Sequence, residues 1–444
     1  MSTEAYWIRN GYLCDPAAGR EGFFDLYTED GVIRKIVPGS GAAAAGGPAA
    51  SFKPAGVPDG TYKVIDAAGQ VILPGLIDLH VHFRDPGLTY KETIQTGTMA
   101  AAHGGFTTVV PMPNTKPPID SIEHLNTLLE LIRNEAVIHV IPVGSVTVGM
   151  AGAQVVDLEA MAALGMKAVS EDGKSVMNSG VYAEAMRRAK ACGVCVLAHC
   201  EDINLVRGGV MNAGRRAEEL GLPGITNAVE DIITARDIYL AAETGVRLHL
   251  CHCSTAESVR LVRNAKEAGI DVSAEVCPHH FTLCEDDIPS DNGMYKMNPP
   301  LRSAADREAL LSGLADGTME TIATDHAPHA SYEKEGSMRK AAFGITGLET
   351  AFAVSYTELV KSGRMQLGTL VTRMSTAPAR ILGLPKGTLT EGSAADLMIA
   401  DLNTPYEIRP EEFFSKGKNT PFGGRRVYGK VRLTMSDGVI VYQE

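Results

Sequence analysis

Short apolar segments of strand length alternate with segments of helical periodicity between residues 71 and 360, and this alternation constrains the fold more than any other feature. The strand candidates are residues 71–82, 106–113, 136–146, 166–171, 194–199, 246–252, 271–277 and 320–325. The helical patterns are residues 93–102, 122–132, 181–191, 229–242, 256–268, 304–314 and 347–360. Eight strands that alternate with helices predict an α/β protein whose middle is a (β/α)8 TIM barrel. A doubly wound open sheet is the competing topology, but no Gly-x-Gly-x-x-Gly pattern follows the first strand.

Both ends of the chain are rich in short β patterns, with Asp-Gly hairpin signals at residues 30–31 and 437–438. The strand candidates are residues 6–13, 23–28, 32–37, 394–400, 425–431 and 439–442. We therefore expect a small β-sandwich domain built from both termini, with domain limits at 1–70, 71–385 and 386–444. Residues 39–60 are rich in Ala, Gly and Pro, which predicts a flexible surface insertion.

The charge and hydropathy of the chain exclude several classes of partner. The 444 residues carry 41 basic and 53 acidic side chains, a formal net charge of −12, which argues against nucleic acid or an anionic membrane. No apolar run is long enough to span a bilayer, and the N-terminus lacks a secretory pattern. The eight cysteines include one Cys-x-x-Cys pair, Cys192 and Cys195, but no second pair completes a zinc site. Buried thiols in a reducing cytoplasm are therefore expected.

Polar side chains follow the predicted strands where a barrel would place its active site. His80 and His82 end the first strand and share one face, because residues i and i+2 of a strand point the same way. The residues that follow later strands are Asn114, Asp172, His199, His252, Asn298, Asp325 and His329. Active sites of such barrels lie at the C-terminal ends of the strands, and imidazole and carboxylate groups are metal ligands. Four histidines and two aspartates at matching positions therefore predict a metal-dependent catalytic site.

The remaining polar residues near these strand ends have simpler interpretations. His279 and His280 follow the seventh strand, and we expect them to be structural or to support a ligand rather than to bind metal. His326 has the opposite strand parity from Asp325 and is expected to point away from the site. The polar segment 329–338 contains a glycine and is either a lid over the site or an ordinary surface loop.

Six segments together resemble the motifs of class I dihydroorotases of the amidohydrolase superfamily: HVHFRDPG, MPNT, NPPLR, ATDHAPH, FGITGLET and KGKNTPF. The resemblance covers essentially the whole chain and implies a distorted barrel with one or two Zn²⁺ ions. It implies that six side chains hold metal: His80, His82 and Asp325 one ion, His199 and His252 the other, with Asp172 bridging. It also implies that Arg84, Asn114 and His329 bind the substrate carboxylate, and that Asn298 and the backbone of Phe343 and Gly344 bind the pyrimidine ring.

The reaction implied by this resemblance is the reversible hydrolysis of (S)-dihydroorotate, a cyclic amide, to N-carbamoyl-L-aspartate in de novo pyrimidine (UMP) biosynthesis. Asp325 would take a proton from the attacking water and return it to the leaving ring nitrogen. Arg84 suits a ring that bears a carboxylate, because a guanidinium group can donate two parallel hydrogen bonds to it. The family further implies a homodimer, and some members associate with aspartate transcarbamoylase.

Two alternatives stay open from the sequence. A hydantoinase- or allantoinase-type cyclic amidase would bridge its metals with a carbamylated lysine, for which Lys167 is the local candidate. Lys167 lies five residues before Asp172 and would face the opposite side of a regular strand, although a bulge would defeat this parity. A non-catalytic assembly subunit is the other alternative, but such a protein should have lost metal ligands, and none is missing.

Overall fold

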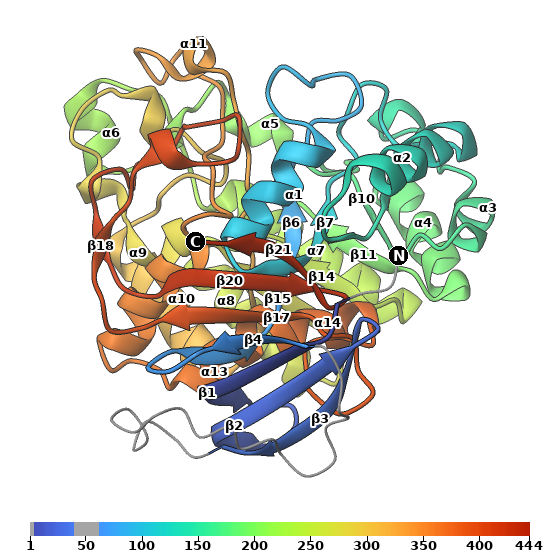
Figure 1. Cartoon of the computed structure of the whole chain (residues 1–444). Coiled ribbons are helices and arrows are strands. Elements are labelled where there is room, and N and C mark those ends of the chain that lie inside the picture. Colours follow the sequence, from blue (N-terminus) through green and yellow to red (C-terminus); the bar gives the residue numbers. More distant parts are fainter. Residues whose placement is uncertain (1–3, 40–61) are drawn as a thin grey trace.

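The computed structural model describes residues 4–39 and 62–444, and Figure 1 shows a barrel beside a β-sheet formed by both ends of the chain. The predicted flexible insertion, residues 39–60, lies outside the described residues except for Gly39. Within the two described ranges, no helix is both long and apolar enough to cross a membrane.

The barrel strands are short and parallel. They are β6 (Leu76–Val81), β7 (Phe106–Pro111), β8 (His139–Val140), β9 (Val143–Ser145), β10 (Ala168–Ser170), β11 (Cys195–Ala198), β14 (Leu248–Leu250), β15 (Val272–Val276) and β16 (Thr321–Ile322). Hydrogen bonds join β6, β7 and β8 in one sheet and β9, β10, β11, β14, β15 and β16 in another. A parallel bridge between Val81 and His326 connects the first strand position to the last, and the His82 amide donates to the His326 carbonyl at 2.8 Å.

The predicted strand 136–146 is interrupted, because β8 pairs only with β7 whereas β9 pairs only with β10. These two short strands occupy the third strand position, so the barrel has eight positions. The (β/α)8 prediction is therefore confirmed, and the break at the third position is its main distortion.

The helices that surround the barrel begin at side chains suited to capping. They are α1 (Ile94–His103), α2 (Ile122–Glu135), α3 (Leu158–Ala163), α4 (Ser179–Cys192), α7 (Ala228–Thr244), α8 (Ala256–Glu267) and α10 (Ala304–Asp316). Thr93, Ser121 and Ser303 each accept a hydrogen bond from a backbone N–H of the first turn, which satisfies a donor that the helix leaves without a partner. Gly245 ends α7 with a φ of 67°, a conformation that glycine adopts without strain.

Shorter elements complete the chain. They are α5 (Ile203–Val206), α6 (Arg215–Leu220), α9 (Pro278–Thr282), α11 (Ser331–Lys334), α12 (Ala351–Ser355), α13 (Leu367–Val371), α14 (Ala377–Leu382), β12 (Met211–Asn212), β13 (Gly224–Ile225), β18 (Tyr406–Glu407) and β19 (Arg426–Val427). The helical pattern predicted at 347–360 starts only at Ala351 and continues as a π-helical turn over Tyr356–Lys361.

The terminal sheet combines strands from both ends of the chain. It contains β1 (Tyr6–Asp15), β2 (Arg20–Glu29), β3 (Val32–Pro38), β4 (Lys63–Asp66), β5 (Val71–Pro74), β17 (Leu397–Asp401), β20 (Lys430–Ser436) and β21 (Val439–Gln443). The hairpins predicted at residues 30–31 and 437–438 join β2 to β3 and β20 to β21. The edge strand β3 also meets the segment before β17 through a bridge between Val32 and Ala394, so the sheet folds back around its own core.

The predicted strand 71–82 is wrong as a single element. Val71–Pro74 form β5 in the terminal sheet, and Leu76–Val81 form β6 in the barrel. Every residue of both strands is buried, so no change of polarity marks the passage from one sheet to the other. Gly75 allows the passage, because a Cβ atom there would lie 2.2 Å from Oγ1 of Thr107. The domain limits 1–70, 71–385 and 386–444 stay a prediction.

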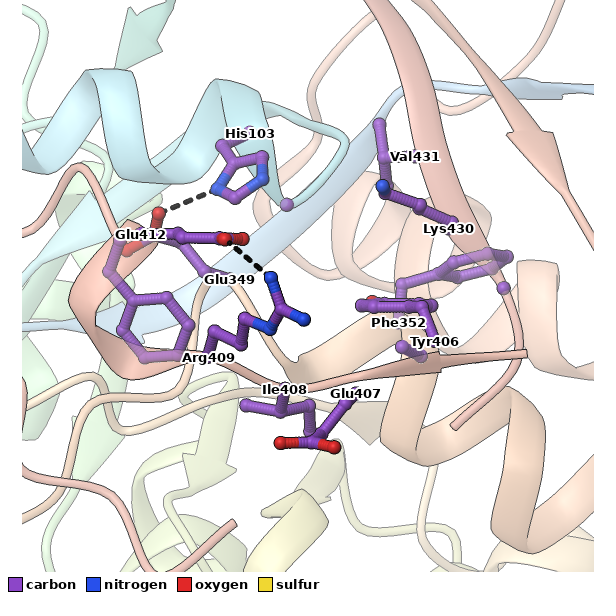
Figure 2. Close-up of a pocket in the computed structure, with 14 residues that line it drawn as sticks. His103, Glu349, Phe352, Tyr406, Glu407, Ile408, Arg409, Glu412, Lys430 and Val431 are labelled. Atoms are coloured by element: carbon purple, nitrogen blue, oxygen red, sulfur yellow. Dashed lines mark hydrogen bonds and ion pairs between the residues drawn. The ribbon is translucent and has the colours of Figure 1, made fainter. Parts of the chain in front are cut away.

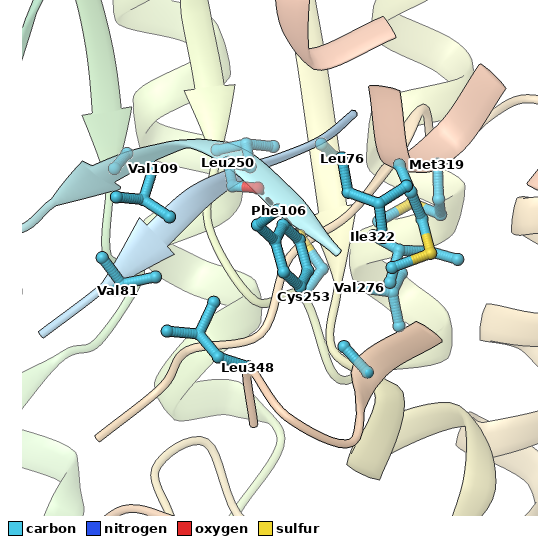
Figure 3. Close-up of a cluster of buried hydrophobic side chains, with 14 of the residues drawn as sticks. Leu76, Val81, Phe106, Val109, Leu250, Cys253, Val276, Met319, Ile322 and Leu348 are labelled. Atoms are coloured by element: carbon cyan, nitrogen blue, oxygen red, sulfur yellow. Dashed lines mark hydrogen bonds between the residues drawn. The ribbon is translucent and has the colours of Figure 1, made fainter. Parts of the chain in front are cut away.

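Alternate residues of the barrel strands pack on opposite sides. In β11, Val196 and Ala198 join the large core beneath the helices, whereas Cys195 and Leu197 join a second cluster with Ile381 of α14. Figure 3 shows part of the large core, where Phe106 packs among side chains from several barrel strands. Burial on both faces explains why these strands are largely apolar, and it leaves their ends as the main place for polar groups.

Candidate metal centre and active site

Five barrel strands bring the six predicted metal ligands together. His80 lies in β6 and His82 directly follows it, while Asp172, His199, His252 and Asp325 follow β10, β11, β14 and β16. All six side chains belong to residues that are at most 7% exposed. Buried charged and polar groups need partners, and several of these side chains lie within ion-pair or hydrogen-bond distance of one another.

Asp172 lies at the centre of this cluster. Its Oδ1 atom is 3.2 Å from Nε2 of His80, 3.4 Å from Nδ1 of His199 and 3.7 Å from Nε2 of His252. Its Oδ2 atom is 3.4 Å from Nε2 of His82. One carboxylate therefore contacts all four imidazoles, which is the position that a bridging ligand would occupy.

Asp325 approaches the same imidazoles from the last strand of the barrel. Its Oδ1 atom is 3.1 Å from Nε2 of His82 and 3.6 Å from Nε2 of His80. Burial alone would raise the pKa of the Asp325 carboxyl, but the hydrogen bond with His82 and the neighbouring imidazoles hold it below the usual range. Asp325 is thus kept as a carboxylate, the form that a metal ligand or a general base requires.

Hydrogen-bond geometry within the cluster fits a bound cation. His80 Nε2, Asp172 Oδ1 and His252 Nδ1 are buried and have no hydrogen-bond partner among the described residues. The ligand atoms of His80, Asp172 and His252 lie within 4.8 Å of one another, and so do those of His80, His82 and Asp325. Buried imidazole nitrogens and carboxylate oxygens that lie this close together are the donor set that a divalent metal takes.

Three residues at the same place have strained backbone conformations. Arg84, His252 and Asp325 have φ angles of 61°, 34° and 48°, in the left-handed region that non-glycine residues seldom adopt. Such conformations cost free energy and persist only where the surrounding structure imposes them, as functional sites do.

Glu275, the penultimate residue of β15, is a site residue that the sequence analysis missed. Its Oε1 atom is 3.0 Å from Nδ1 of His80, and its Oε2 atom is 2.9 Å from Nε2 of His249. Burial opposes ionisation, but the hydrogen bonds with His249 and His80 lower the pKa of Glu275 to about 2. Glu275 is the one acidic residue of β15, and an acid at an inner position of a buried strand is a signal that could have indicated it.

Asn114 is engaged within the metal cluster. Its Oδ1 atom lies 3.0 Å from Nδ1 of His82, and its Nδ2 group donates to Oδ2 of Asp172 at 3.1 Å. The amide therefore orients one histidine and the central carboxylate. To contact the substrate carboxylate as predicted, Asn114 would have to give up one of these hydrogen bonds or use the same amide group for both partners.

Arg84 follows His82 on the same loop and is largely buried, and its Nε atom has no hydrogen-bond partner among the described residues. Burial lowers the pKa of its guanidinium, while the charges of Asp325 and Asp172 oppose this shift. A guanidinium beside the cluster whose Nε has no hydrogen-bond partner in the described part of the chain can receive an anionic ligand.

His329 links the mouth of the barrel to the segment around Phe343. Its Nε2 donates to the Phe343 carbonyl at 2.8 Å, and its Nδ1 lies 3.2 Å from Nζ of Lys91. Burial and the positive charges of Arg84 and Lys91 lower the pKa of His329 to about 3, so the imidazole is neutral. Asn298 is half-buried and follows β15 in the chain, as predicted.

Lys334, which the sequence analysis placed in an undefined lid or loop, is fully buried. Its Nζ atom donates to the carbonyls of Lys296, Ala342 and Gly344, each at 2.8 Å. Burial lowers the pKa of Lys334 to about 7. Residues 331–334 are therefore anchored to the Gly344 backbone, which favours a fixed segment over a free lid.

Lys167 and His326 lie away from the cluster. Lys167 is exposed and precedes β10, whereas Asp172 follows the other end of that strand. The lysine is therefore separated from Asp172 by the length of the strand, and strand parity does not apply because neither residue lies in β10. His326 is buried beside Glu92, with its Nε2 3.4 Å from Oε2 of that residue, which confirms that it points away.

A cavity of about 300 Å³ lies elsewhere, between the end of α1, α12 and the C-terminal segment that contains β18 and β19 (Figure 2). Its lining includes His103, Phe352, Tyr406 and Arg409, and none of the predicted site residues. Among its lining residues, Nδ1 of His103 lies 2.6 Å from Oε1 of Glu349. It is therefore separate from the metal cluster.

The chain is similar to proteins of known activity. A family model described as dihydro-orotase-like matches residues 69–258. A dihydroorotase from Staphylococcus epidermidis is 52% identical over 382 residues, covering 86% of this chain and 90% of the relative. A dihydroorotase from Staphylococcus aureus is 50% identical over 390 residues, covering 88% of this chain and 92% of the relative.

Solved structures with the same architecture cover both the barrel and the terminal sheet. The L-hydantoinase (dihydropyrimidinase) of Arthrobacter aurescens has a TM-score of 0.86 and 27% identity, covering 99% of this chain and 96% of its own. The dihydropyrimidinase of Brevibacillus agri has a TM-score of 0.83 and 26% identity, covering 99% and 95%.

Proposed function

We propose, from the premise that this chain belongs to the dihydroorotase family, that the cluster at the barrel mouth is the active site of a dihydroorotase. The enzyme hydrolyses the cyclic amide of (S)-dihydroorotate reversibly to N-carbamoyl-L-aspartate, a reaction of pyrimidine biosynthesis. The observation that carries the assignment of the site is the position of Asp172, which contacts the imidazoles of His80, His82, His199 and His252.

Two groups of side chains would hold the metal on which this family depends. His80, His82 and Asp325 form one group, His199 and His252 form the other, and Asp172 is shared. We propose Zn²⁺, as one or two ions, because imidazole and carboxylate donors suit it. When bound, the metal would polarise the ring carbonyl and lower the pKa of water from about 15.7 to about 7.

Asp325 is proposed as the residue that moves the proton. The attacking water must lose a proton, and the ring nitrogen must gain one when the amide bond breaks. A carboxylate held ionised beside His82 can accept the first proton and donate it in the second step. Ring closure uses the same proton in the reverse direction.

Arg84 is proposed to bind the substrate carboxylate, together with Asn114 and His329. The guanidinium fork can donate two parallel hydrogen bonds, which fixes the orientation of the ring as well as its position. Asn114 supports this arrangement through His82, and the neutral His329 would need to exchange one of its present contacts. Holding the ring at a remote group lowers the entropic cost of the attack.

The ring itself is proposed to lie against Asn298 and the backbone of Phe343 and Gly344. Gly344 has a φ of 125°, and a Cβ atom there would lie 2.5 Å from the Cβ of Ala327, so only glycine fits. Its carbonyl accepts from Lys334 at 2.8 Å and from Nδ2 of Asn419 at 3.1 Å. These contacts hold the backbone in place before the substrate arrives.

A substrate panel tests the function directly. The purified protein should open dihydroorotate, lose this activity after chelation and regain it with zinc. Allantoin and hydantoin should be poor substrates, because neither ring carries the carboxylate that Arg84 would bind. Comparable turnover of hydantoin would favour the hydantoinase alternative instead, and an inactive protein that binds no metal would favour the assembly subunit.

The partners and location are further proposals. We propose that the protein is a homodimer and that aspartate transcarbamoylase is a candidate second partner. We propose no role for nucleic acid or membrane, because the net charge is −12. We also propose a cytoplasmic location, because all eight cysteines are described and none forms a disulfide.

A further inference from the structure

A second group of potential metal ligands lies at the end of β15, outside the six side chains assigned above. Cys277, His279 and His280 are 0%, 2% and 3% exposed. Each offers a ligand atom, and the three atoms lie within 4.8 Å of one another. Because one turn of chain carries all three, their arrangement does not depend on how the barrel closes.

The hydrogen bonding of His280 leaves one nitrogen ready for a ligand. Its Nε2 atom is 2.9 Å from the Pro299 carbonyl, which can only accept, so Nε2 carries the ring proton. Nδ1 then has a lone pair, and it is buried with no hydrogen-bond partner in the described part of the chain. Metal-bound histidines commonly donate their other N–H to a carbonyl in this way.

His279 also has a nitrogen without a partner in the part of the chain that the structure describes, and it lies beside His280 and Cys277. Nε2 of His279 is also buried without a hydrogen-bond partner in residues 4–39 and 62–444. The two imidazole rings have centroids 4.2 Å apart, and the His280 amide donates to the Cys277 carbonyl at 2.9 Å, which fixes the turn. Two buried nitrogens without partners beside a thiol are unfavourable unless something satisfies them.

We propose that Cys277, His279 and His280 form a second metal site, distinct from the catalytic cluster, for a cation that accepts sulfur and nitrogen ligands, such as Zn²⁺ or Co²⁺. Binding would release the Cys277 thiol proton to solvent and give one thiolate and two neutral imidazoles as ligands. A bound metal would fix the conformation of the turn after β15. His280 of this turn bonds to the Pro299 carbonyl, and Pro299 directly follows Asn298, which is proposed to face the substrate ring. The proposal does not depend on which reaction the enzyme catalyses.

Cobalt substitution tests the proposal in the full-length protein, because the proposed catalytic ligands are nitrogen and oxygen only. A thiolate-to-cobalt charge-transfer absorption would therefore report a cysteine ligand. Wild-type protein saturated with Co²⁺ should show this absorption and Cys277→Ser should lose it. Cys195→Ser should keep it, because Cys195 is buried, contacts the Val196 carbonyl and belongs to no ligand group among the described residues. His280→Gln should bind one cobalt ion fewer than the wild type.

Two outcomes would overturn the proposal. One is the lack of a sulfur-to-cobalt absorption in the saturated wild type. The other is an absorption that survives Cys277→Ser and disappears in Cys251→Ser, because Cys251 lies in a separate group with His80 and Glu275. If Cys277→Ser fails to fold, the wild-type spectrum and the cobalt content of His280→Gln still decide the question.

Discussion

Oε1 of Glu275 lies 3.0 Å from Nδ1 of His80, and both side chains are completely buried in the barrel. This contact decides which nitrogen of His80 faces the site: Nδ1 turns to Glu275, so Nε2 turns to Asp172 at 3.2 Å. Glu275, which is not itself a proposed metal ligand, thus sets the orientation of His80, which is one.

Glu275→Gln should therefore weaken metal binding without unfolding the barrel. Glutamine keeps the shape of the side chain but removes the charge that orients His80, and we expect metal affinity to fall about 10–100-fold. Competition with a chromophoric chelator measures this affinity. Glu257→Gln, on the exposed face of α8 beside Arg260, is the matched control. Unchanged affinity in Glu275→Gln would remove the residue from the site.

Asp325→Asn should abolish proton transfer. We expect kcat to fall about 10²–10⁴-fold, the usual contribution of a general acid–base. Metal content should be measured in the same sample, because Asp325 is also a proposed ligand. Near-normal turnover with metal bound would rule out the acid–base assignment.

Arg84→Met should act mainly on substrate affinity. Losing a charge-assisted hydrogen bond costs about 1.5–3 kcal/mol, so KM for dihydroorotate should rise about 10–100-fold while kcat changes less. Arg84→Lys should recover only part of this loss, because an ammonium group lacks the fork geometry. An unchanged KM in Arg84→Met would show that the carboxylate binds elsewhere.

Lys334→Met should loosen the Gly344 backbone. Three carbonyls would lose their shared donor, and we expect unfolding free energy to fall by about 1–3 kcal/mol. If Gly344 orients the ring, KM should also rise at a temperature where the variant is fully folded. A variant that is less stable but has the wild-type KM would show that Lys334 has a purely structural role.

His139 should make stability depend on pH. Its Nε2 atom is 3.4 Å from both Asp396 and Asp437, and Lys386 also contacts Asp396, so the barrel strand β8 meets the terminal sheet through these charges. Burial alone would lower the pKa of His139, but the hydrogen bonds to Asp396 and Asp437 raise it to about 9. The charged imidazole is therefore favoured in the folded state over the unfolded state.

The stabilisation by His139 should be complete below its unfolded pKa of about 6.5 and disappear as pH rises through about 9. Denaturant unfolding of wild type and His139→Gln should differ by up to about 3 kcal/mol at pH 6, at about 1.4 kcal/mol per pKa unit. The two should converge near pH 10. A difference that stays constant with pH would contradict the ion-pair account.

Sequence patterns identified the barrel and the side chains at its mouth, because both leave local signals. The barrel strands are mostly apolar because both of their faces are buried. Histidines at the ends of such strands are therefore easy to recognise, as at His80, His82, His199 and His252. The sequence also separated Lys167 from Asp172 by strand parity, but the structure separates them because they lie at opposite ends of β10.

Other features have no local signal. The run 71–82 belongs to two sheets, and nothing in its polarity marks the change at Gly75. Lys334 reads as a surface residue of a polar loop, yet three distant carbonyls enclose its ammonium group.

Sequence by itself thus determined which residue types stand at the strand ends and which family the motifs resemble. Only the tertiary structure decided that Asp172 touches four imidazoles, that Glu275 orients His80, and that Asn114 is already engaged by His82. The physical reason is that periodicity depends on neighbours along one strand, whereas these contacts exist only once the barrel closes and brings separate strands to a common centre.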